Sequence, residues 1–161
     1  MKIENLTQQL IPLDEWHPFP KASDRDAWEK LLEASENQER RDVLISAAEE
    51  LVDQPFPSLP ATLFMEYTRT GNRSRYQTPA FLRRRIMGTF ALAECFEHRG
   101  RFIDPLIDAI WRICEESTWC IPAHERTPVL PDVTRPTVDL FSTGTSFAIS
   151  EVYYLLAAEL D

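Results

Sequence analysis

Apolar residues recur every three or four positions along most of this chain, the spacing that places them on one face of an α-helix. No stretch alternates clearly between apolar and polar positions over the length of a strand. We therefore predict an all-α fold of about six helices, several of them paired as antiparallel hairpins. The expected helices cover residues 24–36, 40–52, 61–70, 78–99, 105–114 and 139–159.

Residue types that start and stop helices set these bounds. Ser23 or Asp24 is expected to cap the first helix. Gly71 is the natural stop of the third helix, since glycine tolerates the left-handed conformation that ends many helices. Thr78 and Pro79 form a cap and first-turn pair for the fourth helix. Two further signals complete the set, a stop at Gly100 and a cap for the last helix at Asp139.

The fifth expected helix is the most apolar part of the chain. Asp104 is its expected cap and Pro105 its first residue. Apolar side chains leave it little polar surface, so we expect it to pack on two sides with Trp111 in the core. It runs into the segment 114–125, which gathers two carboxylates, a tryptophan, a proline and a histidine. This segment is the best candidate for part of a binding site.

The length of 161 residues and the hydrophobic fraction of 43% fit one globular domain with a core of its own. We expect an extended lead-in over residues 1–23, because Pro18 and Pro20 keep their preceding residues out of the helical region. The helical domain then covers residues 24–161. Residues 120–137 contain four prolines and are expected to form a long irregular loop, a feature that is usually functional or mobile.

The formal net charge of -9 is unevenly distributed. Residues 69–101 carry eight arginines and two glutamates, whereas residues 1–68 and 102–161 are strongly acidic. The acidity of the whole chain argues against nucleic acid as a partner. The arginine cluster suits a carboxylated or sulfated ligand, since guanidinium groups form forked hydrogen bonds with such anions. Alternatively, the arginines pair with the acids of neighbouring helices.

The three cysteines are an odd number, which fits a reducing compartment better than a closed set of disulfides. Their spacing relative to His124 favours buried thiols over a metal site. We expect no cofactor. No apolar run is long enough to span a bilayer and no secretory signal is evident, so we expect no membrane partner and a cytoplasmic location.

Seven residues are candidates for binding a ligand, each with a structural alternative. His124 either binds an anionic sugar or ties the loop to a helix end, and Trp119 either stacks on a sugar ring or plugs the space under the loop. Glu116 either supports His124 or pairs with an arginine. The remaining candidates follow the third helix and form either part of a groove or a turn with surface arginines: Asn72, Arg73, Arg75 and Tyr76.

A series of short motifs runs in order through the second two thirds of the chain. They are residues 67–76, Arg83-Arg84-Arg85, 93–95, 100–102, 111–116, 119–124, 139–141 and 154–156. Together they cover a region of roughly 60% of the chain that resembles the N-terminal helical part of heparinase II/III-like polysaccharide lyases. That resemblance implies an incomplete (α/α) toroid, which in the family is followed by a β-sandwich.

The resemblance also implies a reaction and a partner. Such lyases cleave uronic-acid-containing polysaccharides by β-elimination, in which a base removes the proton next to the carboxylate and nearby donors stabilise the developing charge. The expected ligand is therefore an acidic oligosaccharide or polysaccharide, and the expected partners are the remaining toroid and the β-sandwich of a longer protein. The family's asparagine, histidine and tyrosine catalysts lie on later helices, so we expect a fragment without lyase activity and assign no catalytic residue.

Two other functions stay open. One is a non-catalytic helical module that binds carbohydrate or another partner. The other is a glycoside hydrolase on the same toroid, which needs two carboxylates that face each other across the bond. Glu115 and Glu116 are adjacent, and adjacent residues on a helix diverge by about 100°, so they are poorly placed for hydrolysis.

Overall fold

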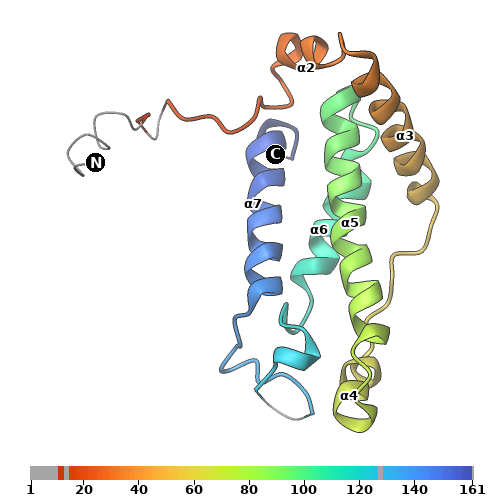
Figure 1. Ribbon diagram of the computed structural model, residues 1–161, viewed down its shortest axis with the longest axis vertical. Coiled ribbons are helices and arrows are strands. Elements are labelled where there is room, and N and C mark those ends of the chain that lie inside the picture. The colour runs from red at the N-terminus through yellow and green to blue at the C-terminus, as the bar shows by residue number, and fades with distance from the viewer. Residues whose placement is uncertain (1–10, 13–14, 127–128, 161) are drawn as a thin grey trace.

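The computed structural model describes residues 11–12, 15–126 and 129–160 of the chain. Across these residues the chain forms helices and no strand, which confirms the all-α prediction (Figure 1). The elements are α2 (Arg25–Leu31), α3 (Ser35–Val52), α4 (Ala61–Thr70), α5 (Ser74–Glu97), α6 (Ile103–Cys114), the 3₁₀ helix η1 (Pro122–His124) and α7 (Leu140–Leu160).

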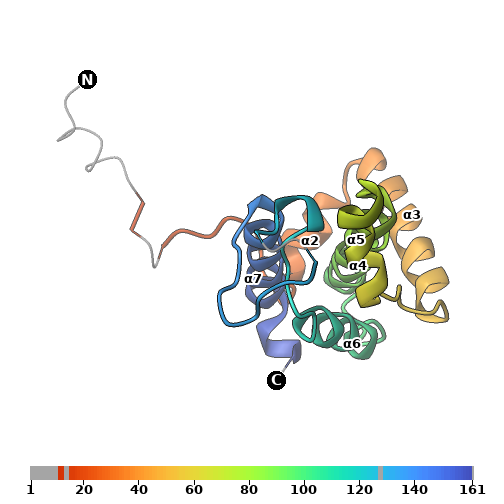
Figure 2. The same cartoon turned by 90° about the horizontal axis from the view of Figure 1, so that it is seen from below.

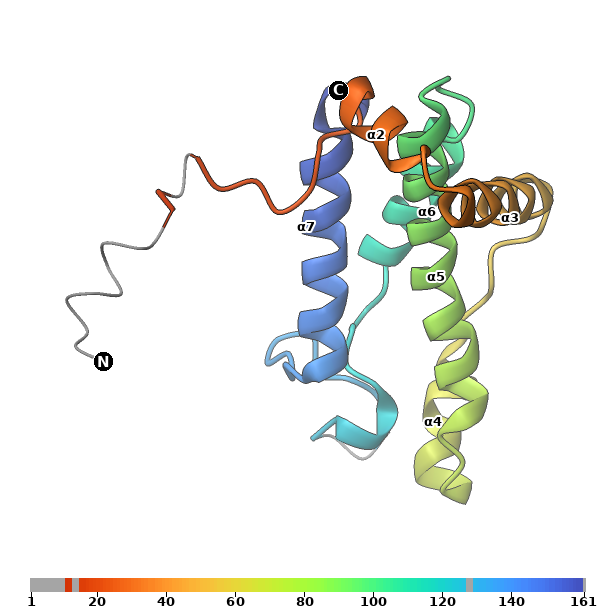
Figure 3. The same cartoon turned by 45° about the horizontal axis from the view of Figure 1, so that its top comes forward.

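Helix α5 is the centre of the arrangement, since α3, α4, α6 and α7 all contact it. Figures 2 and 3 show α3 on one side of α5 and α7 on the other. Helix α6 folds back against α5 as an antiparallel hairpin, and α7 then runs alongside both (Figure 1). The main core lies where these helices meet and includes Ala48, Met87, Phe90, Phe102, Leu106, Ile113, Val152 and Leu156.

A smaller apolar cluster lies where α4 meets the start of α5, and it consists of Phe64, Tyr76 and Ala80. The rings of Phe64 and Tyr76 meet edge to face with their centroids 5.1 Å apart. Such pairs stabilise by more than their buried area alone. This cluster fixes the orientation of Tyr76, which matters for the site described below.

The predicted helix bounds are right for α4, within one residue for α7, and wrong for the other four α-helices of the described residues. Helix α4 ends as expected at Gly71, whose φ of 75° is left-handed. Helix α5 begins at Ser74 and carries Pro79 inside it, so Thr78 and Pro79 are not its cap and first turn. Its start is supported instead by the Asn72 side chain, which accepts a hydrogen bond from the Arg75 backbone N–H at 3.1 Å. Side-chain capping of this kind satisfies an otherwise orphan donor.

Three smaller corrections concern other helix ends. Helix α2 is capped by Asp24 as expected, but it ends at Leu31, and α3 starts at Ser35, earlier than predicted. Helix α6 begins at Ile103, so Asp104 lies in its first turn and does not cap it. Helix α5 ends at Glu97 and is followed by left-handed His98 (φ 53°), two residues before Gly100.

The turn between α5 and α6 is held by a buried carboxylate. Glu94 is 1% exposed, and its two oxygens accept hydrogen bonds from the backbone N–H groups of Gly100 at 2.6 Å and Phe102 at 3.1 Å. These are donors near the start of a helix, which lack partners within the helix itself. Glu94 therefore sets the geometry of the hairpin between α5 and α6.

The prediction that Trp111 lies in the core is wrong, because its side chain is 65% exposed. Helix α6 packs against α5 and α7, but these contacts leave most of the Trp111 side chain uncovered. Together with Ile107 and Tyr153 it lines an apolar groove between α6 and α7. An amphipathic pattern identifies apolar faces, but it does not show whether a neighbour covers each of them.

The described part of the lead-in is tied to α7 by polar contacts. The Tyr154 hydroxyl donates to the carbonyl of Phe19 at 3.1 Å, and the backbone N–H of Ala22 donates to the carbonyl of Leu155 at 2.8 Å. Within the described residues, no helix combines the length and the apolar character that crossing a membrane requires.

Candidate functional site

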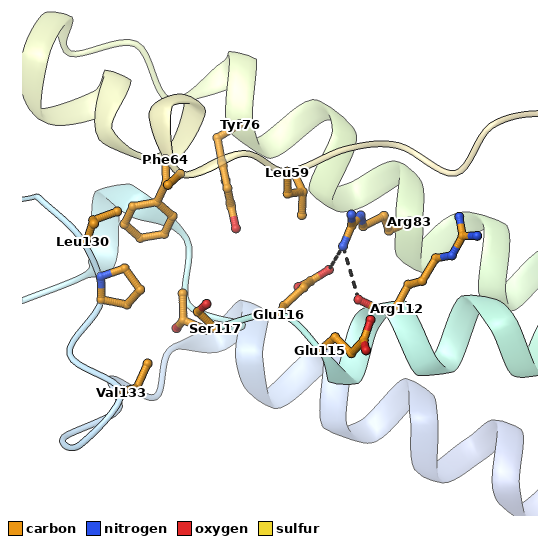
Figure 4. Close-up of a pocket in the computed structure, with 13 residues that line it drawn as sticks. Leu59, Phe64, Tyr76, Arg83, Arg112, Glu115, Glu116, Ser117, Leu130 and Val133 are labelled. Carbon is orange, nitrogen blue, oxygen red and sulfur yellow. Dashed lines mark hydrogen bonds and ion pairs between the residues drawn. The ribbon is translucent and has the colours of Figure 1, made fainter.

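A pocket of about 420 Å³ lies where α4, α5, the end of α6 and the loop after η1 come together. Its volume falls in the range of sites that bind small molecules. Its apolar lining, called the apolar wall below, consists of Leu59, Ala61, Phe64, Leu130, Pro131 and Val133. Its polar lining, called the polar wall, consists of Tyr76, Arg83, Arg112, Glu115, Glu116, Ser117 and Thr118. Figure 4 shows that the two sets are interleaved, with Leu59 between Tyr76 and Arg83. A pocket with such a mixed lining can accept an amphipathic ligand such as a sugar ring.

Glu116 is the most tightly held group of the polar wall. Its carboxylate accepts hydrogen bonds from Arg84 at 2.7 Å and 2.6 Å and from Arg83 at 2.9 Å. All three side chains are nearly buried, at 6% exposed for Glu116 and 12% and 11% for the two arginines. Buried charges are normally paired in this way. Two guanidinium groups share one carboxylate here, so the cluster keeps one uncompensated positive charge.

Tyr76 carries an unpartnered polar atom that faces the pocket. The residue is 6% exposed, and among the described residues its hydroxyl forms no hydrogen bond, since it opens onto the pocket. Figure 4 shows this hydroxyl pointing into the open middle of the pocket. Burial, with the nearby carboxylate of Glu116, raises the pKa of Tyr76 to about 12, although Arg84 and Arg83 act in the opposite direction. Tyr76 is therefore a neutral hydrogen-bonding group at physiological pH.

Arg83 is held at the pocket by three kinds of contact. Its Nε donates to the carbonyl of Pro57 at 2.7 Å, its Nη1 donates to Glu116, and its guanidinium lies over the ring of Phe56. Its Nη2 has no acceptor within the part of the chain that the structure describes. Arg112 also lies over Phe56, and Figure 4 shows its guanidinium directed away from the centre of the pocket.

The structure brings two of the seven candidate residues, Tyr76 and Glu116, to this pocket. Glu116 pairs with arginines and not with His124. Arg83 was not singled out from the sequence, although it belongs to the arginine cluster that was. The sequence does not show that Glu116 pairs with arginines of α5, because this contact depends on how the helices pack.

His124 and Trp119 lie outside the pocket lining. The Nδ1 atom of His124 lies 2.8 Å from Oδ2 of Asp139, at the start of α7, so this histidine ties the loop to a helix end. The Asp139 carboxylate also accepts a hydrogen bond from the backbone N–H of Ser142, so Asp139 caps α7 as predicted. The Trp119 indole donates to the carbonyl of Ile113 at 2.8 Å and packs against the main core. Both residues take the structural alternatives given above.

Asn72 and Arg73 lie in the turn between α4 and α5 and Arg75 lies in the first turn of α5, and none of the three lines the pocket. The side chain of Asn72 supports the start of α5, as described, and Arg75 pairs with Glu66 at 2.6 Å. This arrangement matches a turn with surface arginines.

The long loop is closed at its neck by two contacts. One joins His124 to Asp139, and the other joins the Thr137 hydroxyl to Glu125 at 2.6 Å. Loops with close ends that carry their own packing are often functional. The neck places Leu130, Pro131 and Val133 on the apolar wall of the pocket.

Two of the three cysteines are buried and Cys114 is exposed, so the expectation of buried thiols is wrong for Cys114. The described residues contain no group of three histidine, cysteine or acidic side chains arranged to hold a metal ion. Burial, as the largest cause, raises the pKa values of the Cys95 and Cys120 thiols to about 12, so both are protonated at neutral pH. These two cysteines therefore behave as buried apolar groups.

A scan against protein-family models finds no match to this chain, and a search of curated proteins finds no similar sequence. The geometry of the pocket is therefore the basis on which a function can be argued.

Proposed function

We propose that this helical chain binds a uronic-acid-containing saccharide in the pocket between α4, α5 and the end of α6. The carrying observation is the Tyr76 hydroxyl, a hydrogen-bonding group on a nearly buried side chain that faces the pocket without a protein partner. A hydroxyl that faces a pocket and is not engaged by the protein is free to form a hydrogen bond with a ligand hydroxyl. The excess positive charge beside it favours an acidic ligand.

The two walls of the pocket support a saccharide in particular. A sugar ring has hydroxyl groups around its edge and C–H groups on its faces. The rings and apolar side chains of Phe64, Leu59 and Pro131 suit those faces, while the hydroxyls of Tyr76 and Ser117 suit the edge.

Within this proposal, the chain contributes one wall of the sugar groove of a heparinase II/III-like lyase that acts by β-elimination. The exposed apolar groove between α6 and α7, with Trp111 65% exposed, is the kind of surface on which further toroid helices would dock. Tyr76 acts as a hydrogen-bond donor and not as the base, because a phenol with a pKa of about 12 stays protonated near neutral pH. We therefore expect binding without cleavage.

The hydrolase alternative finds less support. Both oxygens of Glu116 are occupied by guanidinium groups, so this carboxylate is held as a structural anion. Glu115 is exposed on the rim. A pair of carboxylates facing each other across a glycosidic bond is therefore not formed by these two residues.

Calorimetric titration of the whole chain with a panel of hexuronate oligosaccharides tests the proposal. We expect saturable binding to at least one acidic member, weakened by added salt. Absorbance of the same mixtures should not rise, since no unsaturated uronate ends are expected. Absence of binding to every acidic member would contradict the proposal, and rising absorbance would contradict the assignment of binding without cleavage.

Two variants locate the site. Tyr76→Phe should weaken binding, whereas the double variant Arg73→Ala, Arg75→Ala should weaken it much less, since those arginines lie at the neighbouring turn. The reverse pattern would place the site at the turn between α4 and α5 and would overturn the assignment to this pocket.

A further inference from the structure

Two hydrogen-bond donors of different charge lie seven positions apart on the same face of α5. One is the neutral hydroxyl of Tyr76, and the other is the Nη2 group of the Arg83 guanidinium. Both residues line the pocket, and neither donor has a protein acceptor among the described residues. Seven residues are about two helical turns, so the two side chains leave α5 from the same face.

We infer that Arg83 is the residue that makes the pocket select an acidic sugar over a neutral one, its free Nη2 receiving the ligand carboxylate while Tyr76 pairs with a hydroxyl of the same sugar unit. This inference rests on the proposed function, since it assigns separate roles within the proposed binding site.

The contacts of Arg83 show why it is suited to this role. Bonds to Pro57 and Glu116 and the contact with Phe56 leave its side chain 12% exposed and fix its orientation. A fixed guanidinium loses little conformational freedom when it binds an anion. Glu116 does not cancel its charge, because the same carboxylate is also shared with Arg84.

Glu116 and Arg84 act as positioning residues. Arg84 donates hydrogen bonds from two nitrogens to Glu116, and its Nε also donates to the Thr145 hydroxyl of α7 at 3.1 Å. Glu116 in turn holds Nη1 of Arg83, which leaves Nη2 as the donor that remains for a ligand. Arg112 is less suited, because its guanidinium is exposed at the rim and points away from the pocket centre.

The test compares a hexuronate trisaccharide with its carboxyl-reduced, neutral counterpart on the same protein. The wild-type chain should bind the acidic ligand at least about tenfold more tightly, the factor expected from one charged hydrogen bond. Arg83→Lys should remove most of that preference by weakening the acidic ligand alone. Tyr76→Phe should weaken both ligands by a similar factor, of about two- to tenfold, and leave the preference in place.

Arg85→Lys is the matched control, because Arg85 is an exposed residue of the same helix that does not line the pocket. It should change neither affinity. If Arg83→Lys keeps the full preference for the acidic ligand, the inference is wrong even though the proposed function stands. If the wild-type chain binds neither ligand, the proposed function itself is wrong.

A measurement on the wild-type protein covers the case in which Arg83→Lys does not fold. The Nε–H of Arg83 is held by Pro57 at 2.7 Å, so its NMR signal should be protected from exchange and observable. It should shift saturably with the acidic trisaccharide and much less with the neutral one. Equal shifts with both ligands, or none with the acidic one, would overturn the inference.

Discussion

Glu116 and Arg84 form a two-pronged ion pair, with Nη1 and Nη2 of the arginine donating to the two carboxylate oxygens at 2.7 Å and 2.6 Å. This ion pair joins the segment just after α6, which holds Glu116, to the middle of α5, which holds Arg84. Through the bond from Arg84 to Thr145, it also reaches α7. One buried contact therefore links three helices and shapes the polar wall of the pocket.

Removing the Glu116 carboxylate should strongly destabilise the fold. Glu116→Ala leaves two buried guanidinium groups without their anion, a change that costs about 3–5 kcal/mol. The free energy of unfolding in urea measures the effect. Glu115→Ala is the control, because Glu115 is exposed and its loss should change stability by about 0.5 kcal/mol or less. Equal effects of the two substitutions would show that the ion pair is not structurally important.

The hairpin between α5 and α6 should depend on Glu94. Glu94→Gln keeps the size of the side chain but replaces one acceptor oxygen with a donor, which faces the backbone N–H of Gly100 or Phe102. Leaving such a buried donor unsatisfied should cost about 1–3 kcal/mol. Thermal and urea unfolding measure the change. Glu97→Gln, which weakens an ion pair with Arg101, an exposed residue one turn away, should cost about 1 kcal/mol or less.

Alanine substitutions at two glycines should change the stability of the fold in opposite directions. At Gly71 the φ of 75° is left-handed, so Gly71→Ala should destabilise the chain by about 1 kcal/mol. At Gly88, inside α5, a new Cβ would meet no atom within 4 Å, so Gly88→Ala should stabilise by about 0.5–1 kcal/mol. Unfolding midpoints of the two variants test this contrast, and a loss of stability at Gly88 would show that α5 is more tightly packed there than the structure indicates.

Stability should fall at low pH partly through Asp139. Its partial burial acts to raise the pKa, but hydrogen bonds from Ser142, His124 and Ile121 outweigh burial and hold the pKa below its usual value. A carboxyl with a lowered folded-state pKa stabilises fully above its unfolded pKa of about 3.9, and this contribution is lost as the pH falls through the folded value.

The comparison with Asp139→Asn isolates this contribution. Asparagine can still cap α7, but it does not titrate. The stability difference between the two proteins should be present at pH 5 and should shrink below about pH 4. A difference that stays the same throughout acidification would show that Asp139 does not carry the effect.

The all-α class and the bounds of α4 followed from the sequence because they rest on local signals: helical periodicity and a glycine that tolerates a positive φ. The start of α5 did not, because Pro79 normally marks the beginning of a helix, whereas here the side chain of Asn72 starts the helix earlier. Local patterns compete, and tertiary packing decides between them.

The candidate site was less predictable for the same reason. Tyr76 and Glu116 were both named from the sequence, but 40 positions separate them, and nothing local indicates that they line one pocket. The role of Arg83 was hidden within a cluster of three arginines. Trp111 shows the opposite error: its helical spacing is that of a core residue, yet the described residues leave its side chain 65% exposed.

Substituting only the oxygen of Tyr76 separates binding from folding. Because its hydroxyl opens onto the pocket without a hydrogen bond to the described protein atoms and the ring packs against Phe64, Tyr76→Phe should leave the free energy of unfolding unchanged within about 0.5 kcal/mol. A loss of stability beyond this would mean that the hydroxyl supports the fold and is not reserved for a ligand.

The most direct test of saccharide binding is NMR observation of the Tyr76 ring while the whole chain is titrated with a hexuronate trisaccharide. We predict saturable shifts of the Tyr76 and Phe64 ring signals, with the Trp111 ring unchanged. Shifts confined to the Trp111 groove, or no shift at saturating ligand, would contradict the proposal that the pocket of Tyr76 and Arg83 binds an acidic sugar.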